Sequence, residues 1–441
     1  MKWRSIDYCW IIVGVTSLVL LAGAGIRATP GILILPLEQE CGWSRATISF
    51  AVSLNLLLYG LIAPFAVAIM ERYGVRRCIL IALLVLACAI ASTALMEHVW
   101  QLIVVWGVLV GTGAGFLATV LAATVASRWF TAKRGLVIGI FSGAAATGQL
   151  VFLPAMSSIN SVYGWRVTLI CIVGVLCALL PLVVIFFRER PSDVGMLPYG
   201  ETKPAEPAEP AERVAARHEN PFALAILALR NASSNRNFWI ISGTFFVCGA
   251  STNGLLGTHL IPACVDHGYS EITGAALLAT MGTFNFFGTS ISGWLSDKFD
   301  NRSLLAIYYG VRGVSLLYLP FSFDDIYTMS IFAAFFGLGW FATVSPTVRI
   351  LVNTFGRERA PLVFGWVFVC HQLGGASAAA FAALIRMTYS DYFSAFMISG
   401  LLCFVAAIAV TFIEAGDSRP DAMADREIEG SELRPGLSAQ K

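Results

Sequence analysis

The chain has 441 residues, of which 57% are hydrophobic and only 13% are charged, and its formal net charge is +2. Soluble domains carry about 25% charged residues, so the composition is typical of an integral membrane protein. The near-neutral charge argues against a nucleic-acid-binding protein, and the absence of metal-ligand spacings and of a GxxxxGK[ST] loop argues against a metal cofactor and direct ATP coupling.

The apolar residues fall into twelve runs of about 20 residues, the length with which a helix crosses the hydrocarbon core. These runs do not alternate with period two, so helices are expected rather than the strands of a barrel. The first run is too long for the core of a cleaved signal peptide and is expected to be the first span. The predicted spans are 9–35, 47–70, 78–96, 99–127, 135–159 and 165–187, followed by 237–263, 271–296, 303–322, 326–353, 361–386 and 391–413.

One long polar stretch separates the two sets of spans. It contains KPAEPAEPAE, a Pro/Ala/Glu segment that cannot bury enough apolar surface to fold alone. A short apolar piece at 221–229 is expected to lie on the membrane surface. The predicted organisation is an N-terminal six-helix half (1–187), a linker (188–236), a C-terminal six-helix half (237–413) and a tail (414–441).

The short loops differ in charge on the two sides of the predicted bundle. Lys and Arg gather in the loops between spans 2 and 3, 4 and 5, 8 and 9, and 10 and 11, whereas the opposite loops are mainly acidic. Cytoplasmic loops carry the excess of basic residues in membrane proteins. Both termini and the linker are therefore predicted to be cytoplasmic.

The two halves repeat one charged pattern. ERYGVRR at 71–77 follows the second span and GWLSDKFDNR at 293–302 follows the eighth, and each has an acid, a base, a turn and further bases. These loops resemble the motif of the major facilitator superfamily, with Glu71 where that motif usually has Asp. The resemblance implies an all-α membrane protein with twelve transmembrane helices in two pseudo-symmetric halves.

In the resembled family, these loop charges join helix ends on the cytoplasmic side when the transporter is open outward. The resemblance therefore implies a gating role, and the alternative is that the charges only set the topology. The candidate gating residues are Glu71, Arg72, Arg76, Asp297, Lys298 and Arg302.

Further segments narrow the resemblance to one branch. DYCW at 7–10, RWFTAKRGLVIG at 128–139 and EQECGWSRATIS at 38–49 together resemble the monocarboxylate transporter and oxalate–formate antiporter branch, in its bacterial form. The predicted eighth span lacks the Arg that carboxylate carriers of this branch often have. Trp106 stands in helix 4 where drug-efflux members usually have an Arg, which speaks against that class.

The ionisable residues deep in the predicted spans are few and none is acidic: Arg27, His259, Arg312 and His371. Such residues usually face a water-filled cavity or a partner. A cavity lined by cationic and neutral groups favours an anion. Arg27 is the leading candidate for substrate contact, and the alternative is that it snorkels to the outer interface.

Each of the other deep residues has two possible roles, one in ligand binding and one in helix packing. Arg312 either contacts ligand or bonds backbone carbonyls of neighbouring helices. His371, beside Gln372, could donate to a carboxylate and carry a proton, or could make a satisfied interhelical hydrogen bond, and His259 has the same alternatives. The uncharged candidates for ligand contact are Asn285, Tyr59, Gln149 and Asn253. The alternative is that these side chains form hydrogen bonds between helices.

The sequence thus predicts a secondary active transporter, not an enzyme, that moves a small organic anion by alternating access. A monocarboxylate is the expected substrate, proton symport is left open, and no cofactor is expected. The rival hypotheses are proton-coupled efflux of a drug or metabolite and a transporter-like sensor. The expected state is a monomer in the lipid bilayer of a bacterial inner membrane, with no nucleic-acid partner.

Overall fold

The computed structural model of the chain describes residues 5–29, 33, 36–37, 40–43, 45–201 and 220–414. At several helical positions only the backbone is described, and Gln149 is one of them. The described residues form helices connected by short loops and contain no β-strand.

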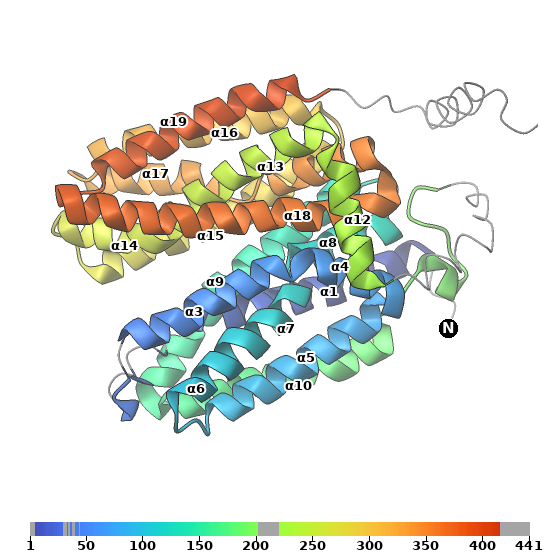
Figure 1. Cartoon of the computed structure of the whole chain (residues 1–441), viewed down its shortest axis with the longest axis horizontal. Coiled ribbons are helices and arrows are strands. Elements are labelled where there is room, and N and C mark those ends of the chain that lie inside the picture. Colours follow the sequence, from blue (N-terminus) through green and yellow to red (C-terminus); the bar gives the residue numbers. More distant parts are fainter. Residues whose placement is uncertain are drawn as a thin grey trace, which may run out of the picture.

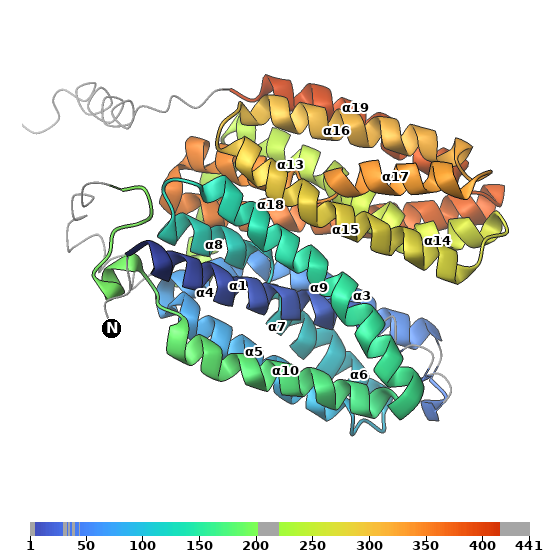
Figure 2. The same ribbon diagram turned by 180° about the vertical axis from the view of Figure 1, so that it is seen from behind.

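The helices form two bundles that lie side by side (Figures 1 and 2). The N-terminal bundle consists of α1 (Ser5–Ala28), α3 (Arg45–Leu61), α4 (Ala63–Tyr73), α5 (Val75–Thr93), α6 (Val99–Leu102), the π-helical η1 (Ile103–Val110), α7 (Gly111–Phe116), α8 (Thr119–Trp129), α9 (Arg134–Tyr163) and α10 (Trp165–Phe186). The C-terminal bundle consists of α13 (Arg236–Gly249), the π-helical η3 (Ala250–Leu256), α14 (Gly257–Asp266), α15 (Glu271–Ser296), α16 (Asn301–Tyr318), η4 (Leu319–Phe321), α17 (Ile326–Gly339), α18 (Val344–Tyr389), α19 (Phe393–Ala409) and η5 (Val410–Phe412).

These elements correspond to the twelve predicted spans. Eight helical stretches of described residues are long and apolar enough to cross a membrane, or nine if the bent pair α3–α4 is one span. One of the eight, Ile326–Tyr389, contains two predicted spans, because Gly356 adopts φ 80° and ψ 161° and interrupts α18. The remaining two predicted spans are α9 and α15, with 30 and 26 residues, and a helix needs about 20 to cross the hydrocarbon core.

The two bundles meet through backbone contacts that only glycine permits. A Cβ on Gly139 of α9 would lie 2.5 Å from the carbonyl oxygen of Thr289 in α15. A Cβ on Gly365 of α18 would lie 2.6 Å from the Cα of Pro64 in α4. These approaches join span 5 to span 8 and span 2 to span 11, and they are two of the places where the halves meet.

The described parts of the linker lie at one end of the molecule, called here the linker end. After the short helix η2 (Pro191–Val194), Tyr199 pairs with Phe130 through a single parallel bridge. The chain returns through α12 (Pro221–Ser233), which lies across both bundles at this end (Figure 1). Trp366 of α18 donates from Nε1 to the carbonyl oxygen of Ala225 at 2.9 Å. The predicted apolar piece at 221–229 is therefore part of a helix that contacts both halves, and its place on the membrane surface stays a prediction.

Candidate functional site

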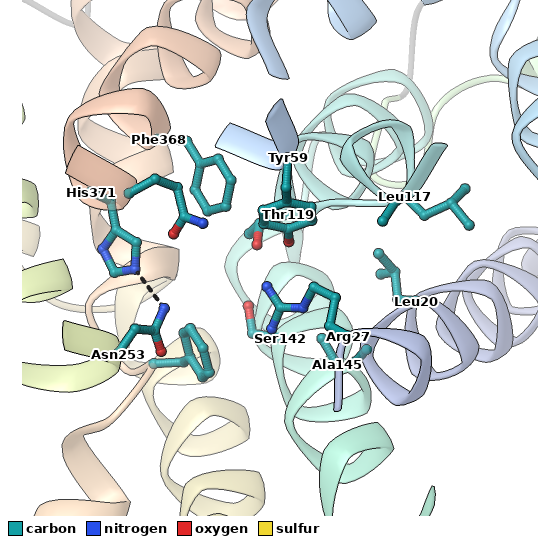
Figure 3. Close-up of a pocket in the computed structure, with 15 residues that line it drawn as sticks. Leu20, Arg27, Tyr59, Leu117, Thr119, Ser142, Ala145, Asn253, Phe368 and His371 are labelled. Carbon is teal, nitrogen blue, oxygen red and sulfur yellow. Dashed lines mark hydrogen bonds between the residues drawn. The ribbon is translucent and has the colours of Figure 1, made fainter. Parts of the chain in front are cut away.

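A cavity lies between the two bundles, and both contribute to its wall (Figure 3). The N-terminal bundle supplies side chains from α1, α3, α7, α8 and α9, and the C-terminal bundle supplies them from η3, α18 and the turn before α18. The lining residues are Leu20, Gly23, Ala24, Arg27, Tyr59, Ala114, Leu117, Thr119, Ser142, Ala145, Asn253, Phe341, Phe368, His371 and Gln372. Among these described residues, Arg27 is the one permanent charge and no carboxylate is present.

Arg27 stands in the last turn of α1 and points into the cavity beside Tyr59 (Figure 3). Its guanidinium carbon lies 4.7 Å from the centre of the Tyr59 ring, a cation–π contact. Within the described part of the chain the guanidinium makes no hydrogen bond and no ion pair. A cation in a membrane interior normally has a partner, so Arg27 is available to an anion.

The opposite wall carries a buried imidazole with both ring nitrogens engaged. His371 Nδ1 lies 3.2 Å from the carbonyl oxygen of Phe245, and Nε2 lies 3.3 Å from Asn253 Nδ2. These contacts assign the proton to Nδ1, with Nε2 accepting from the amide. The ring is also stacked on Phe368 with an interplanar angle of 13°. Protonation of Nε2 would require Asn253 to turn its amide and offer its oxygen instead.

Gln372 and Tyr59 complete the polar part of the wall. Gln372 packs where α18 and α3 approach closely, because a Cβ on Gly60 would lie 2.8 Å from Gln372 Cβ. The Tyr59 ring contacts Phe368 edge to face at 5.7 Å. Five of the residues predicted for substrate contact, two from the first half and three from the second, therefore line one cavity: Arg27, Tyr59, Asn253, His371 and Gln372.

Sequence reasoning missed several lining residues. Ser142 of α9 is buried in the cavity wall, and its Oγ has no hydrogen-bond partner in the described part of the chain. It is therefore a free hydroxyl beside Arg27 (Figure 3). Ser142 belongs to the small-residue run SGAAATG, and nothing in that run indicates that its hydroxyl lines a cavity. Thr119 and Phe341 were also missed, although each lies next to an interrupted helix.

Three predicted residues lie away from this cavity and have protein partners. His259 has Nδ1 3.2 Å from the hydroxyl of Tyr392 and Nε2 2.9 Å from the carbonyl oxygen of Ala379. Asn285 accepts at Oδ1 from the backbone N–H of Phe341 at 3.1 Å. Arg312 is fully buried and donates from Nη2 to the carbonyl oxygens of Gly339 and Trp340. The side chain of Gln149 is outside the described residues.

Comparison with known proteins gives the family. The family model of the Major Facilitator Superfamily matches residues 15–379 and again residues 268–438. The chain belongs to the major facilitator superfamily. The predicted fold class, two six-helix halves spanning a membrane, is thereby confirmed, and the protein is an integral membrane transporter and not an enzyme.

Curated facilitator relatives match at low identity over most of the chain. The uncharacterized MFS-type transporter YcxA of Bacillus subtilis is 23% identical, over 83% of this chain and 86% of its own length. The oxalate:formate antiporter of Oxalobacter formigenes is 22% identical over 93% of both chains. Monocarboxylate transporter 11 of Homo sapiens is 22% identical, over 89% of this chain and 80% of its own. The predicted resemblance to this branch is confirmed.

Solved facilitator structures share the fold. The E. coli fucose:proton symporter FucP superposes with a TM-score of 0.65 at 16% identity, covering 92% of this chain and 99% of that one. A double Trp mutant of XylE gives a TM-score of 0.69 at 14% identity, covering 93% and 98%. At these identities the likeness concerns the fold alone.

The second copy of the facilitator loop motif joins the two halves. The carboxylate of Asp297 accepts from the backbone N–H groups of Gly135 and Leu136 at 2.9 and 3.0 Å, at the first turn of α9. It also pairs with Arg349 at 3.4 Å. Gly135 is required here, because a Cβ would lie 2.5 Å from the backbone carbonyl oxygen of Gly293. Asp297 is thus the motif acid that bonds across the halves.

The first copy makes its described contacts within its own half. Glu71 pairs with Arg128 at 3.2 Å, and Glu189, after α10, pairs with Arg128 at 3.4 Å. Glu189 also accepts from the backbone N–H groups of Val75 and Arg76 at 2.7 Å, which caps α5. The guanidinium of Arg72 lies over the ring of Tyr73.

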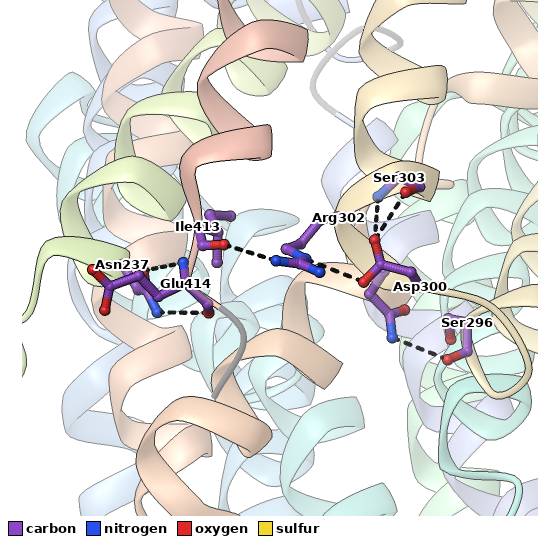
Figure 4. A network of polar contacts seen from close by, with 8 residues as sticks. Asn237, Ser296, Asp300, Arg302, Ser303, Ile413 and Glu414 are labelled. Carbon is purple, nitrogen blue, oxygen red and sulfur yellow. Dashed lines mark hydrogen bonds and ion pairs between the residues drawn. The ribbon is translucent and has the colours of Figure 1, made fainter. Parts of the chain in front are cut away.

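The remaining basic residues of the second copy make their described contacts within the C-terminal half. Lys298 lies 4.1 Å from the centre of the Trp294 ring. Arg302 donates to Asp300 and to the carbonyl oxygen of Ile413 at 3.2 Å (Figure 4). These contacts join the loop after α15 to the end of the last span, within the C-terminal half.

Arg357 is a contact between the halves that the motif did not predict. From the start of the eleventh span it donates to the carbonyl oxygens of Ser127 and Arg128 at the end of α8. It also bonds Thr131 Oγ1 at 3.0 Å and the linker residue Glu201 at 3.1 Å. Together with Asp297, these bonds close the molecule at the linker end.

Proposed function

We propose that this transporter moves a small organic anion, a monocarboxylate, by alternating access. The observation that carries the proposal is the unpaired guanidinium of Arg27 in a cavity built from both halves. One fixed positive charge with no acid among the described lining residues suits a ligand with one negative charge. The relatives named for monocarboxylate transport and oxalate:formate exchange support the same class.

The neutral donors around Arg27 fit the rest of such a ligand. The free hydroxyl of Ser142 lies on the Arg27 side, and the amides of Asn253 and Gln372 lie on the other. A ligand that bonds to both walls links the halves, and this makes its binding sensitive to their relative position. Drug efflux with proton antiport would favour an acid in the wall, and the described lining has none.

We further propose that the linker end faces the cytoplasm of a bacterium, in its inner membrane, and that the monomer is the working unit. The basic loops of the sequence lie at this end, which is the cytoplasmic side under the positive-inside rule. With the linker end closed by Asp297 and Arg357, the described conformation is closed to the cytoplasm.

Counterflow in proteoliposomes tests the proposed function. Vesicles loaded with an unlabelled monocarboxylate should accumulate the labelled compound transiently, because a carrier exchanges substrate across the membrane without energy input. Candidate acids can first be ranked by the rise in melting temperature, since a ligand that binds only the folded state stabilises it. Binding without counterflow would support the sensor, and neither binding nor counterflow with any monocarboxylate would refute the proposal.

Proton coupling, if the carrier has it, is predicted to use His371. Histidine is the side chain that exchanges a proton close to neutral pH, and His371 shares the cavity with Arg27 while no carboxylate does. A bound anion would favour the charged imidazole, so proton and substrate would bind cooperatively. We expect His371→Gln to lose accumulation driven by a pH gradient and to retain exchange of labelled substrate.

His259→Gln is the matched control, because it removes an imidazole whose two nitrogens bond Tyr392 and Ala379 outside the cavity. This variant should keep gradient-driven accumulation. Full gradient-driven accumulation in both variants would exclude coupling through these histidines and would indicate that the proton moves by another route, such as on the substrate itself.

A further inference from the structure

The fourth span of each half contains the same interrupted sequence. Residues 113–120 read GAGFLATV and residues 337–344 read GLGWFATV, with identity at five of eight positions. In both places the helix stops within this segment: α7 ends at Phe116 and α8 begins at Thr119, while α17 ends at Gly339 and α18 begins at Val344. The fifth residue of each segment, Leu117 or Phe341, lines the cavity.

An interruption frees backbone groups that must find partners inside a membrane. In the N-terminal half these partners are local turns. The N–H of Leu117 donates to Ala114 at 2.9 Å, and the N–H of Ala118 donates to Gly115 at 3.3 Å. Leu117 also packs against α1, where a Cβ on Gly23 would lie 3.3 Å from Leu117 Cβ.

In the C-terminal half similar local turns are present, and side chains from two other spans also bond the backbone. Asn285 Oδ1 accepts from the N–H of Phe341 at 3.1 Å, and Ser292 Oγ donates to the carbonyl oxygen of Ala342 at 2.6 Å. Arg312 donates to the carbonyl oxygens at the end of α17. Those carbonyls carry the partial negative charge of a helix C-terminus, which suits a buried guanidinium.

We propose that Arg312, Asn285 and Ser292 are positioning residues for transport: they hold the unwound segment of span 10, and through it they fix Phe341 as a wall of the anion cavity. None of the three lines the cavity. Each acts on a different backbone group, so together they fix the segment on both sides of Phe341. In the matching segment of span 4, no side chain of another span bonds the backbone among the described residues, so it is the more adaptable wall.

Substrate selectivity separates this role from a merely structural one. The proposal rests on the proposed function for the kind of ligand, and a size-graded series of monocarboxylates from acetate to phenylpyruvate is the probe. Phe341→Ala should raise the kcat/KM ratio of the largest to the smallest transported acid by about tenfold, because removed side-chain volume admits the larger ligand. Asn285→Ala should raise the same ratio by about threefold, although its own side chain is outside the cavity.

Ser290→Ala is the control on the same helix. Ser290 is partly exposed, and among the described residues it donates to the carbonyl oxygen of Phe286, one turn earlier in α15. It should leave the ratio unchanged. If Asn285→Ala lowers uptake of all acids by one common factor, or leaves the ratio unchanged, the positioning role is wrong.

Hydrogen exchange tests the same bonds without substrate. In Asn285→Ala the amide of Phe341 loses its acceptor and should exchange about tenfold faster in a peptide covering 340–343. The equivalent peptide covering 117–118 should not change. Unchanged exchange at 340–343 would overturn the inference, whereas faster exchange in a protein that transports no acid would support it and refute only the proposed function.

Discussion

Arg27→Ala should abolish uptake of the organic anion while leaving the protein folded in the membrane. Within the described residues Arg27 is the one permanently charged side chain in the cavity wall, and its partner Tyr59 offers no negative charge. Removing one member of a desolvated charge pair costs about 2–5 kcal/mol, which is roughly 30-fold or more in kcat/KM. Arg27→Lys should recover only part of this, because an ammonium does not reproduce the planar fork of a guanidinium.

Labelled uptake into proteoliposomes, together with the melting temperature of each purified variant, checks this result. Arg230→Ala is the matched control, since it removes an exposed arginine of α12 that lies outside the cavity. It should transport at the wild-type rate. Normal uptake by Arg27→Ala would exclude Arg27 from the substrate site.

The membrane fold was predictable because its signals are local. About 20 consecutive apolar residues are required for each span, and the repeated charged loops reveal the two halves. Gly356 shows what such signals miss. It interrupts one continuous helical stretch through a backbone conformation, φ 80°, that nothing in its neighbourhood distinguishes from other glycines in the chain.

The candidate site was predictable only in part, since the role of a buried polar residue depends on distant partners. Arg27 and Arg312 look alike in sequence, each an arginine within an apolar run. Arg312 finds acceptors at Gly339 and Trp340, whereas Arg27 finds none among the described residues. The acceptors exist because span 10 is interrupted. The sequence feature that marks this interruption is the ATV segment, and its repetition in span 4 can be recognised only when the two halves are aligned.

The two motif acids illustrate the same limit. Sequence treats Glu71 and Asp297 as equivalents, and both pair with an arginine at the end of a neighbouring span, Arg128 or Arg349. Asp297 additionally caps α9 of the other half, while Glu189 supplies the cap of α5 within the first half. The gating roles of both acids stay predictions. Their contacts differ, because Asp297 bonds to the other half and Glu71 bonds within its own half.

Asp297→Asn should open the linker end and slow turnover more than it weakens ligand binding. Both carboxylate oxygens of Asp297 accept backbone N–H groups of α9, so an amide would turn its own NH2 toward one of these donors. Losing charge-assisted bonds of this kind costs about 1–3 kcal/mol, and the cost falls only on the state in which the halves meet. The equilibrium between the closed and open linker end should therefore shift by roughly 5- to 150-fold.

Spin labels at Tyr73 and Phe299, exposed residues of the two halves near the linker end, can report this shift as a change in their distance distribution. Asp300→Asn is the matched control from the same loop, because Asp300 caps α16 through Ser303 and pairs with Arg302 without reaching the other half. It should leave the distribution unchanged, and Glu71→Gln, whose bond lies within one half, should shift it less than Asp297→Asn.

An unchanged distance distribution in Asp297→Asn, combined with a collapse of ligand affinity, would instead place Asp297 in substrate binding. The cavity geometry opposes that outcome, since Asp297 contacts the first turn of α9, while the cavity is lined by Ser142 and Ala145 two turns and more further along the same helix.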